Sequence, residues 1–399
     1  MDETEKTRLS EEIPDWRWHA GSQSLLLILL DTNSMQQTKP RNSNLELYRI
    51  LVMWVIVIHH YVVNSGLLGE LALNSTSTAS QFCYLAGGGG KTGINCFVLI
   101  TGYFMCKSDI TLHKFLKLVL QVLSYNVVIA AIFALTGYHS YSFGEVAKLL
   151  LPVKGMSDGF TSCFLLFFLC IPFLNILIRR LNQTQHLKLL LLLLFGYSFL
   201  AFPPFSMPVT FNYVSWFGVL YILSSYIRLY PLKQDGNVKL WFVLTLISIM
   251  VGVASVLYLI KKGNPFPYHY ISDSNQLISL WMAVSSFMLF KNLRVPQSRI
   301  INTLGAATFG VLLIHANSDV MRTWLWKDVV DCVGHYHAAY NEAYMLASVT
   351  AIFLACAGID YLRKRFIEDK MLALADRGVE TLKTIDLFKK VKSSISKES

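Results

Sequence analysis

The chain has 399 residues, of which 54% are hydrophobic and only 15% are charged, and its mean hydropathy is +0.45. Soluble domains carry about 25% charged residues. The composition therefore excludes a disordered protein, a coiled coil and a small disulfide-bonded secreted domain, and it favours a protein that crosses a membrane several times. The net charge of +10 would point to nucleic acid in a soluble protein, but in a membrane protein such an excess collects in cytoplasmic loops.

Ten apolar segments approach the roughly 20 residues that a membrane-spanning helix requires. They are residues 45–63, 92–106, 116–137, 160–178, 187–203, 211–230, 239–260, 276–292, 303–318 and 343–361. The expected fold is therefore an all-α bundle of about ten transmembrane helices. The seven cysteines form no CxxC pair. We therefore expect them to pack as small hydrophobic residues, and we expect no metal site.

The two ends of the chain are polar. Residues 1–40 are expected to form an extension in which Met35 could be the biological start, because the apolar run after Ser24 is too short to span and lacks a cleavage-like ending. Residues 41–365 then make up the membrane domain. Residues 366–399 form a tail of mixed charge that we expect to be helical in part.

Orientation follows from the distribution of Lys and Arg. With the N-terminus in the cytoplasm, the segments on the cytoplasmic side hold 27 of the 35 basic residues and the opposite loops hold seven. This asymmetry predicts an even number of spans, with both termini cytoplasmic. One basic residue, Arg49, is left inside the first span.

The first span carries the most informative polar residues, which are Glu46, Arg49, His59 and His60. At 100° per residue, Arg49 and His60 fall within about 20° of each other on the helix, roughly 16 Å apart along its axis. Glu46 precedes Arg49 by three residues, within side-chain reach. Charged groups inside a span indicate function: an arginine suits an anionic group, and a histidine suits proton transfer. The alternative is an arginine that reaches the membrane surface and two interfacial histidines.

Four blocks of sequence resemble the acyltransferase-3 family of membrane acyltransferases, in the same order as in that family. They are LELYR followed by ten residues and His60, GKTGINCFVLITGYF at 90–104, GFTSCFLLFFLCIPFLN at 159–175, and INTLGAATFGVLLIHANSDVMRTWLW at 301–326. Glu46 stands where the family more often has Asp, and Thr101 where it has Ser. The fourth block is similar to the subgroup that acts on surface polysaccharides.

The resemblance implies transfer of an acyl group, usually acetyl, from cytoplasmic acyl-coenzyme A to a hydroxyl of an extracytoplasmic or lipid-linked glycan, in the cell membrane of a bacterium. His60 would be the general base, or would carry the acyl group covalently. Arg49, with Glu46, would contact the donor, and a basic cluster beside the second span would hold its phosphates. The residues expected at the donor phosphates are Lys107, Lys114 and Lys117, and those expected at the acceptor are Lys91, Asn95, Thr101, Tyr103 and His315.

Several of these residues have structural alternatives. Asn95 and Thr101 suit hydrogen bonds between helices, and His315 with Asn317 and Asp319 suits a polar contact that closes the bundle. The run AGGGGK at 86–91 lacks the glycine spacing of a phosphate-binding loop, so we expect a flexible connection into the second span.

Two other functions remain open from the sequence alone: a transporter, and a glycan flippase or polymerase. The absence of a second Arg–His stripe disfavours a transporter built from repeats, and the short outer loops disfavour a polymerase.

Overall fold

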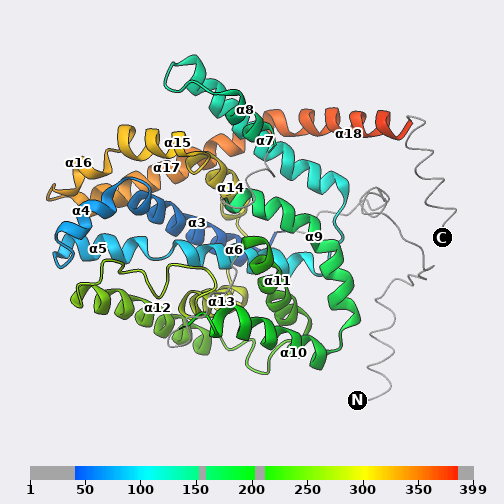
Figure 1. The fold of residues 1–399 in the computed structure, drawn as a ribbon. Coiled ribbons are helices and arrows are strands. Elements are labelled where there is room, and N and C mark those ends of the chain that lie inside the picture. The colour runs from blue at the N-terminus through cyan, green and yellow to red at the C-terminus, as the bar shows by residue number, and fades with distance from the viewer. Residues whose placement is uncertain (1–40, 152–158, 203–211, 385–399) are drawn as a thin grey trace.

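The computed structural model describes residues 41–151, 159–202 and 212–384, and these residues form helices and no strands (Figure 1). The N-terminal extension with Met35 and the tail beyond residue 384 lie outside the described residues. The elements are α3 (Ser43–Val63), α4 (Leu67–Leu73), α5 (Thr78–Gly87), α6 (Gly90–Met105), α7 (Leu112–Leu135), α8 (Phe143–Leu150), α9 (Phe160–Arg180), α10 (Gln183–Leu194), η1 (Phe195–Phe199), α11 (Tyr213–Leu229), α12 (Val238–Lys261), α13 (Leu277–Asn292), α14 (Arg299–His315), α15 (Asp319–Thr323), η2 (Trp324–Val329), α16 (Cys332–Tyr336), α17 (Asn341–Arg363), η3 (Lys364–Glu368) and α18 (Asp369–Thr384).

Several of these helices suit a membrane, so the chain is a multi-pass membrane protein. By length and composition, five helices can cross a bilayer, and a sixth is obtained if α14 and the helix that follows it, bent by 94°, count as one span. The five are α3, α7, α9, α12 and the continuous helix from Asn341 to Val379.

The expected number of ten spans is not confirmed. Each of the ten expected segments contains a helix in its described part, but α6 and α13 have 16 residues and α11 has 17. At 1.5 Å per residue such helices rise about 24–26 Å, less than the roughly 30 Å of a hydrocarbon core. The number of ten spans therefore stays a prediction, and five or six helices meet the length and composition of a span.

Helix α3 occupies the centre of the molecule, in contact with α5, α6, α13, α14 and α17. In Figure 1 it crosses the middle beside α6, with α14 and α17 on one side and α12 and α13 on the other. The amide of Asn44 fixes its first turn by donating to the carbonyls of Phe290 and Lys291, at 3.0 and 2.9 Å. A helix surrounded in this way can carry polar groups without exposing them to lipid.

The glycine run before α6 is not the flexible connection that the sequence suggested. Helix α5 continues to Gly87 and α6 begins at Gly90. A Cβ on Gly89 would lie 2.3 Å from Cγ1 of Val55, and one on Gly90 would lie 2.2 Å from Cγ of His59. Glycine is therefore required here because the backbone packs directly against α3.

The last span continues without interruption into the tail. A π-helical turn, η3, joins α17 to α18, and the helix extends to Thr384. The expectation of a partly helical tail is confirmed over the part that the structure describes.

Candidate active site

The end of α3 that carries His60 meets the end of α14. Nδ1 of His60 lies 2.9 Å from Nε2 of His315, and Nδ1 of His315 lies 2.6 Å from the carbonyl oxygen of Val311. His60 is half-buried, whereas His315 is fully buried. The two residues that the sequence placed in separate candidate clusters thus form one histidine pair.

The hydrogen bonds of this pair define which nitrogens carry protons when both rings are neutral. A carbonyl oxygen only accepts, so Nδ1 of His315 donates to Val311 and Nε2 of His315 is left as an acceptor. Nδ1 of His60 must then donate to His315. The assignment leaves Nε2 of His60 unprotonated, which is the form that a general base requires.

His59 serves a different purpose from its neighbour. Its Nδ1 lies 2.6 Å from the carbonyl oxygen of Gly87, and its ring occupies the space beside Gly90. This contact holds the start of α6 against α3. His59 therefore contributes to packing, and His60 is the histidine that pairs with His315.

The opposite end of α3 carries a buried carboxylate with two arginines. Oε1 of Glu46 accepts from Nη1 of Arg41 at 3.0 Å and from Nη1 of Arg49 at 3.2 Å. Glu46 is 5% exposed, and its other oxygen lies against Gly305, where a Cβ would approach within 2.4 Å. The expected Glu46–Arg49 pair is present, and Arg41 adds a second cation.

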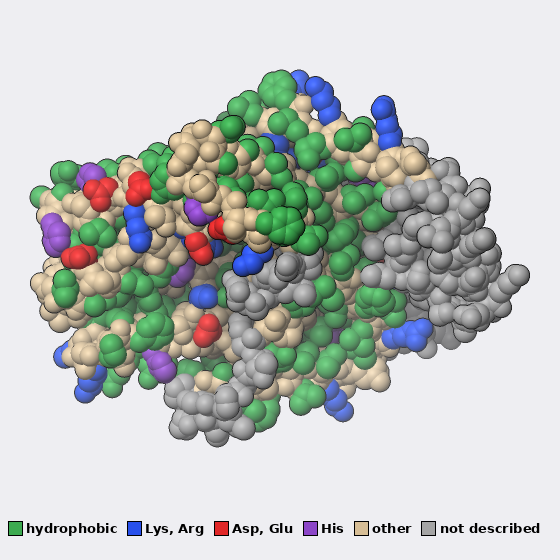
Figure 2. Space-filling view, turned by 45° about the horizontal axis from the view of Figure 1, so that its top comes forward, with side chains coloured by type: hydrophobic (Ala, Val, Ile, Leu, Met, Phe, Trp, Pro, Cys, Tyr) green, Lys and Arg blue, Asp and Glu red, His purple; other side chains and the backbone are tan. Residues whose placement is uncertain are grey.

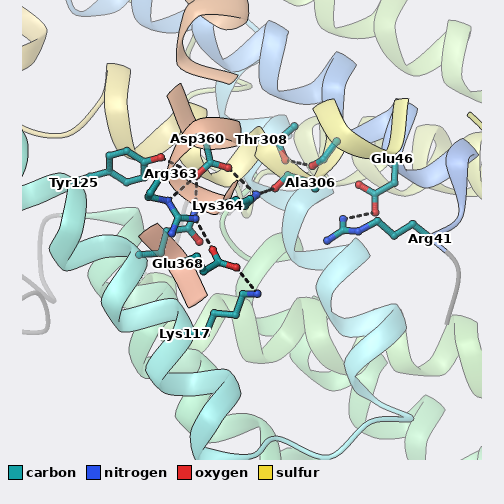
Figure 3. Close-up of polar contacts among 12 residues, drawn as sticks. Arg41, Glu46, Lys117, Tyr125, Ala306, Thr308, Asp360, Arg363, Lys364 and Glu368 are labelled. Carbon is teal, nitrogen blue, oxygen red and sulfur yellow. Dashed lines mark hydrogen bonds and ion pairs between the residues drawn. The ribbon is translucent and has the colours of Figure 1, made fainter. Parts of the chain in front are cut away.

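A second buried carboxylate, Asp360 of α17, lies on the other side of α14 (Figure 3). It accepts from the Tyr125 hydroxyl at 2.7 Å, from Nε of Arg363 at 3.1 Å, and pairs with Nζ of Lys364 at 2.7 Å. Lys364 also donates to the Ala306 carbonyl at 2.6 Å. Figure 3 shows Ala306 and Thr308 of α14 between Asp360 and Glu46.

None of the residues of this network is among the predicted site residues except Lys117. A carboxylate at the end of an apolar segment is a signal of a functional or structural polar site, and Asp360 has that position in 343–361. Its partners on α7 are more than 230 positions away, so no local pattern connects them.

Four of the five residues expected at the acceptor are spread along α6, and the fifth, His315, ends α14. Asn95 links helices, since its amide donates to the Ser274 carbonyl at 2.7 Å and accepts from Nε1 of Trp216 at 2.9 Å. Thr101 donates to the Phe97 carbonyl within its own helix. Lys91 lies at the start of α6, at the His60 end of α3, and donates to the Tyr213 hydroxyl at 2.8 Å.

Tyr103, the remaining residue of this group, lies at the far end of α6. Its hydroxyl accepts from Nη1 of Arg228 at 2.7 Å. Since α3 and α6 are antiparallel neighbours, Tyr103 belongs to the Arg49 end and not to the His60 end. The structure therefore does not bring Tyr103 and Thr101 together with the histidine pair.

The three expected phosphate-binding lysines do not converge. Nζ of Lys117 pairs with Oε1 of Glu368 at 2.6 Å (Figure 3), and Lys114 donates to the Asp109 carbonyl at 2.7 Å. Lys107 is exposed at the end of α6. Within the described ranges, no three His, Cys, Asp or Glu side chains are placed to hold a metal ion.

An open polar pocket of about 470 Å³ lies beyond the His60 end of α3, where α4, α5, α16 and the start of α17 meet. Figure 2 shows acidic and histidine side chains at this end of the molecule, with further acidic, basic and histidine side chains towards the middle of the same face. The polar residues that line the pocket are Glu70, Asn74, Ser77, Thr78, His337, Asn341 and Glu342.

These features define a polytopic membrane protein with a histidine pair at one end of a central helix and two arginines on a buried carboxylate at the other. The family model described as an acyltransferase domain matches residues 42–362. The chain therefore belongs to the acyltransferase-3 family. No curated protein and no solved structure shows significant similarity to it.

Proposed function

We propose that this protein is a membrane O-acyltransferase that moves an acetyl group from cytoplasmic acetyl-coenzyme A to a hydroxyl of a polysaccharide or lipid-linked glycan outside the cytoplasm. The observation that carries the proposal is the histidine pair, because its hydrogen bonds leave Nε2 of His60 free to accept a proton. Membership in the acyltransferase-3 family supports the reaction class.

The chemical step assigns one role to His60. Its Nε2 takes the proton from the acceptor hydroxyl as the oxygen attacks the thioester carbonyl. The carbon–sulfur bond then breaks, and the departing sulfur takes the same proton from the imidazolium. An ester and free coenzyme A are formed. Burial of His315 beside His60 keeps the imidazole oriented throughout.

Arg49 and Glu46 belong to the donor side in this proposal. Arg49 and Glu46 lie 11 and 14 positions before His60 on the same helix, which is roughly 16 and 21 Å along its axis. The long, flexible arm of coenzyme A would follow α3 from the arginines towards the histidine pair. The excess of basic residues on one side supports a cytoplasmic position for the Arg49 end and for both termini.

The polar pocket beyond the His60 end supports the position of the acceptor. Carboxylates, amides and hydroxyls are the groups that hydrogen-bond sugar hydroxyls, and the pocket offers all three. The acceptor would thus approach from the side opposite the donor, in the cell membrane of a bacterium.

The test is transfer of label from acetyl-coenzyme A to polysaccharide in isolated membranes that contain the protein. His60→Ala should reduce the rate by about 10² to 10⁴, the contribution of a positioned general base, with unchanged protein level in the membrane. His269→Ala removes an exposed histidine and serves as the matched control. Full activity of His60→Ala, or accumulation of a solute without any label on glycan, would overturn the proposal.

A further inference from the structure

A group of aromatic and cationic side chains surrounds the ring of Tyr103 at the Arg49 end of the bundle. Cζ of Arg228 lies 4.5 Å from the ring centroid and its Nη1 donates to the hydroxyl at 2.7 Å, while Nζ of Lys291 lies 5.9 Å from the same centroid. The three residues come from α6, α11 and α13. A tyrosine ring favours cations over its face, so the ring holds both side chains in fixed positions.

The charges in this group do not balance. Both carboxylate oxygens of Asp235 lie 2.6 Å from Nζ of Lys291. Arg228, which is half-buried, has no carboxylate within ion-pair distance in the part of the chain that the structure describes. Its hydrogen-bond partner, the Tyr103 hydroxyl, is neutral. One positive charge of the group is therefore not matched by a carboxylate.

The group adjoins the arginine end of α3. The carbonyls of Phe290 and Lys291 accept from Asn44 in the first turn of α3, and the ring of Phe290 stacks on Tyr48 at 4.7 Å. Arg41 and Arg49 share the single carboxylate of Glu46 at the same end. Excess positive charge thus gathers on both sides of this contact between α3 and α13.

The chemistry of the surplus cation indicates its ligand. A guanidinium presents five N–H donors in a planar fork that matches the oxygens of a phosphate, and Arg228 uses one of them on Tyr103. Lys291 lies beside the same ring with its side chain 8% exposed, and its charge is already matched by Asp235. The lysines that the sequence suggested for this purpose are held elsewhere, Lys117 by Glu368 and Lys114 by a backbone carbonyl.

We propose that Arg228, held on Tyr103, binds a phosphate group of the nucleotide end of the acyl donor. The inference rests on the proposed acyl transfer from coenzyme A. Arg228 is a binding residue in this proposal and takes no part in proton transfer. A lipid headgroup offers the same phosphate chemistry, so the experiment must separate the two sources.

The test compares acetyl-coenzyme A with acetyl-pantetheine, a donor that keeps the thioester and lacks all the phosphates of the nucleotide. With purified full-length protein, Arg228→Gln should raise KM for acetyl-coenzyme A about tenfold or more, as loss of a charged hydrogen bond predicts, and leave KM for acetyl-pantetheine unchanged. Arg228→Lys keeps the charge and loses the fork, so its effect should be intermediate. An equal rise for both donors, or for neither, overturns the inference.

Arg179→Gln is the matched control, because it removes an arginine charge at the same end of the bundle where the side chain is half exposed and paired with Asp109. It should leave both KM values unchanged. A thermal unfolding midpoint of Arg228→Gln close to that of the wild type would show that the fold is retained. If Arg228→Gln lowers the midpoint strongly, KM for acetyl-coenzyme A and for acetyl-pantetheine is compared in Arg228→Lys instead.

Equilibrium binding of coenzyme A without acceptor separates this inference from the proposed function. Coenzyme A that binds the wild type and His60→Ala equally, and Arg228→Gln more weakly, supports the phosphate site even if no acetylated glycan is found. Binding of coenzyme A that is unaffected by Arg228→Gln, together with binding of anionic phospholipid vesicles that Arg228→Gln weakens, would assign Arg228 to headgroups and overturn the inference.

Discussion

At the scale of single residues, the protonation of His60 depends on His315. Without an acceptor at Nδ1, the neutral ring of His60 is free to place its proton on Nε2, the nitrogen that should receive the acceptor's proton. We expect His315→Ala to lower kcat by about 10- to 100-fold, less than the loss of the base itself. KM for the donor should change little. Steady-state kinetics with acetyl-coenzyme A measures both constants.

The conservative variant distinguishes orientation from packing. In His315→Gln the side-chain carbonyl can accept from Nδ1 of His60, although it cannot also keep the bond to Val311. Activity should therefore lie between that of the wild type and that of His315→Ala. If glutamine and alanine are equally poor, the ring of His315 has a role other than accepting this hydrogen bond.

The sequence predicted the residues of one helix better than their partners. The common face of Arg49 and His60 and the pairing of Arg49 with Glu46 follow from the geometry of a single helix. The partner of His60 is 255 positions away, and no local spacing encodes such a contact. His315 was identified as a candidate only through its resemblance to a family block, and its contact with His60 required the structure.

At the scale of elements, α14 is confined between two carboxylates. Gly305 lies against Glu46 of α3, and Gly310 lies against Asp360 of α17, where a Cβ would be 2.3 Å from Cγ of Asp360. His315 ends the same helix, one and a half turns beyond Gly310. These two close contacts therefore fix the position of α14, and with it the histidine pair.

Gly310→Ala should displace α14, because the atoms that the methyl meets include Cγ and Cβ of Asp360 and cannot swing away. Overpacking of this kind costs roughly 1 to 3 kcal/mol, so the thermal unfolding midpoint and the acetylation rate should both fall. Gly218→Ala on α11 is the control, since nothing lies within 4 Å of its added methyl. Equal midpoints for the two variants would contradict the close packing of α14.

Asp360→Asn tests the buried network around α14. The substitution removes the charge that Arg363 and Lys364 share, in a residue with no exposed surface. Removal of one partner from a buried ion pair costs roughly 3 to 5 kcal/mol, measured as a large fall in the unfolding midpoint in detergent. Asp319→Asn, whose side chain is 94% exposed in its pair with Arg322, should cost less than about 1 kcal/mol.

The lengths of the helices show where the hydropathy of the sequence does not predict a membrane-spanning helix. Every expected segment is helical where it is described, yet α6, α11 and α13 are shorter than a bilayer requires. All three belong to the interior around Tyr103 and Asn95. Helices buried by their neighbours are as apolar as helices in lipid, so composition alone does not separate the two.

At the scale of the whole molecule, polar groups are separated between the two ends of the bundle. The His60 end holds the histidine pair and the polar pocket, and the Arg49 end holds the arginines, Tyr103 and Lys291. This polarity allows an anionic donor and a neutral sugar to approach from opposite sides. This separation of polar groups serves acyl transfer across the membrane only if the two ends of the bundle face different compartments.

The orientation can be tested by single cysteines and a membrane-impermeant maleimide. Lys107 at the end of α6 and Lys261 at the end of α12 are both exposed, and the proposed orientation places the first inside and the second outside. In intact cells, Lys261→Cys should react and Lys107→Cys should react only after the membrane is permeabilised. The native chain supplies a low background, because six of its seven cysteines are buried and Cys170 is half-buried. The reverse pattern would place the arginines outside the cell, where cytoplasmic coenzyme A cannot reach them, and would remove the physical basis for the donor site on α3.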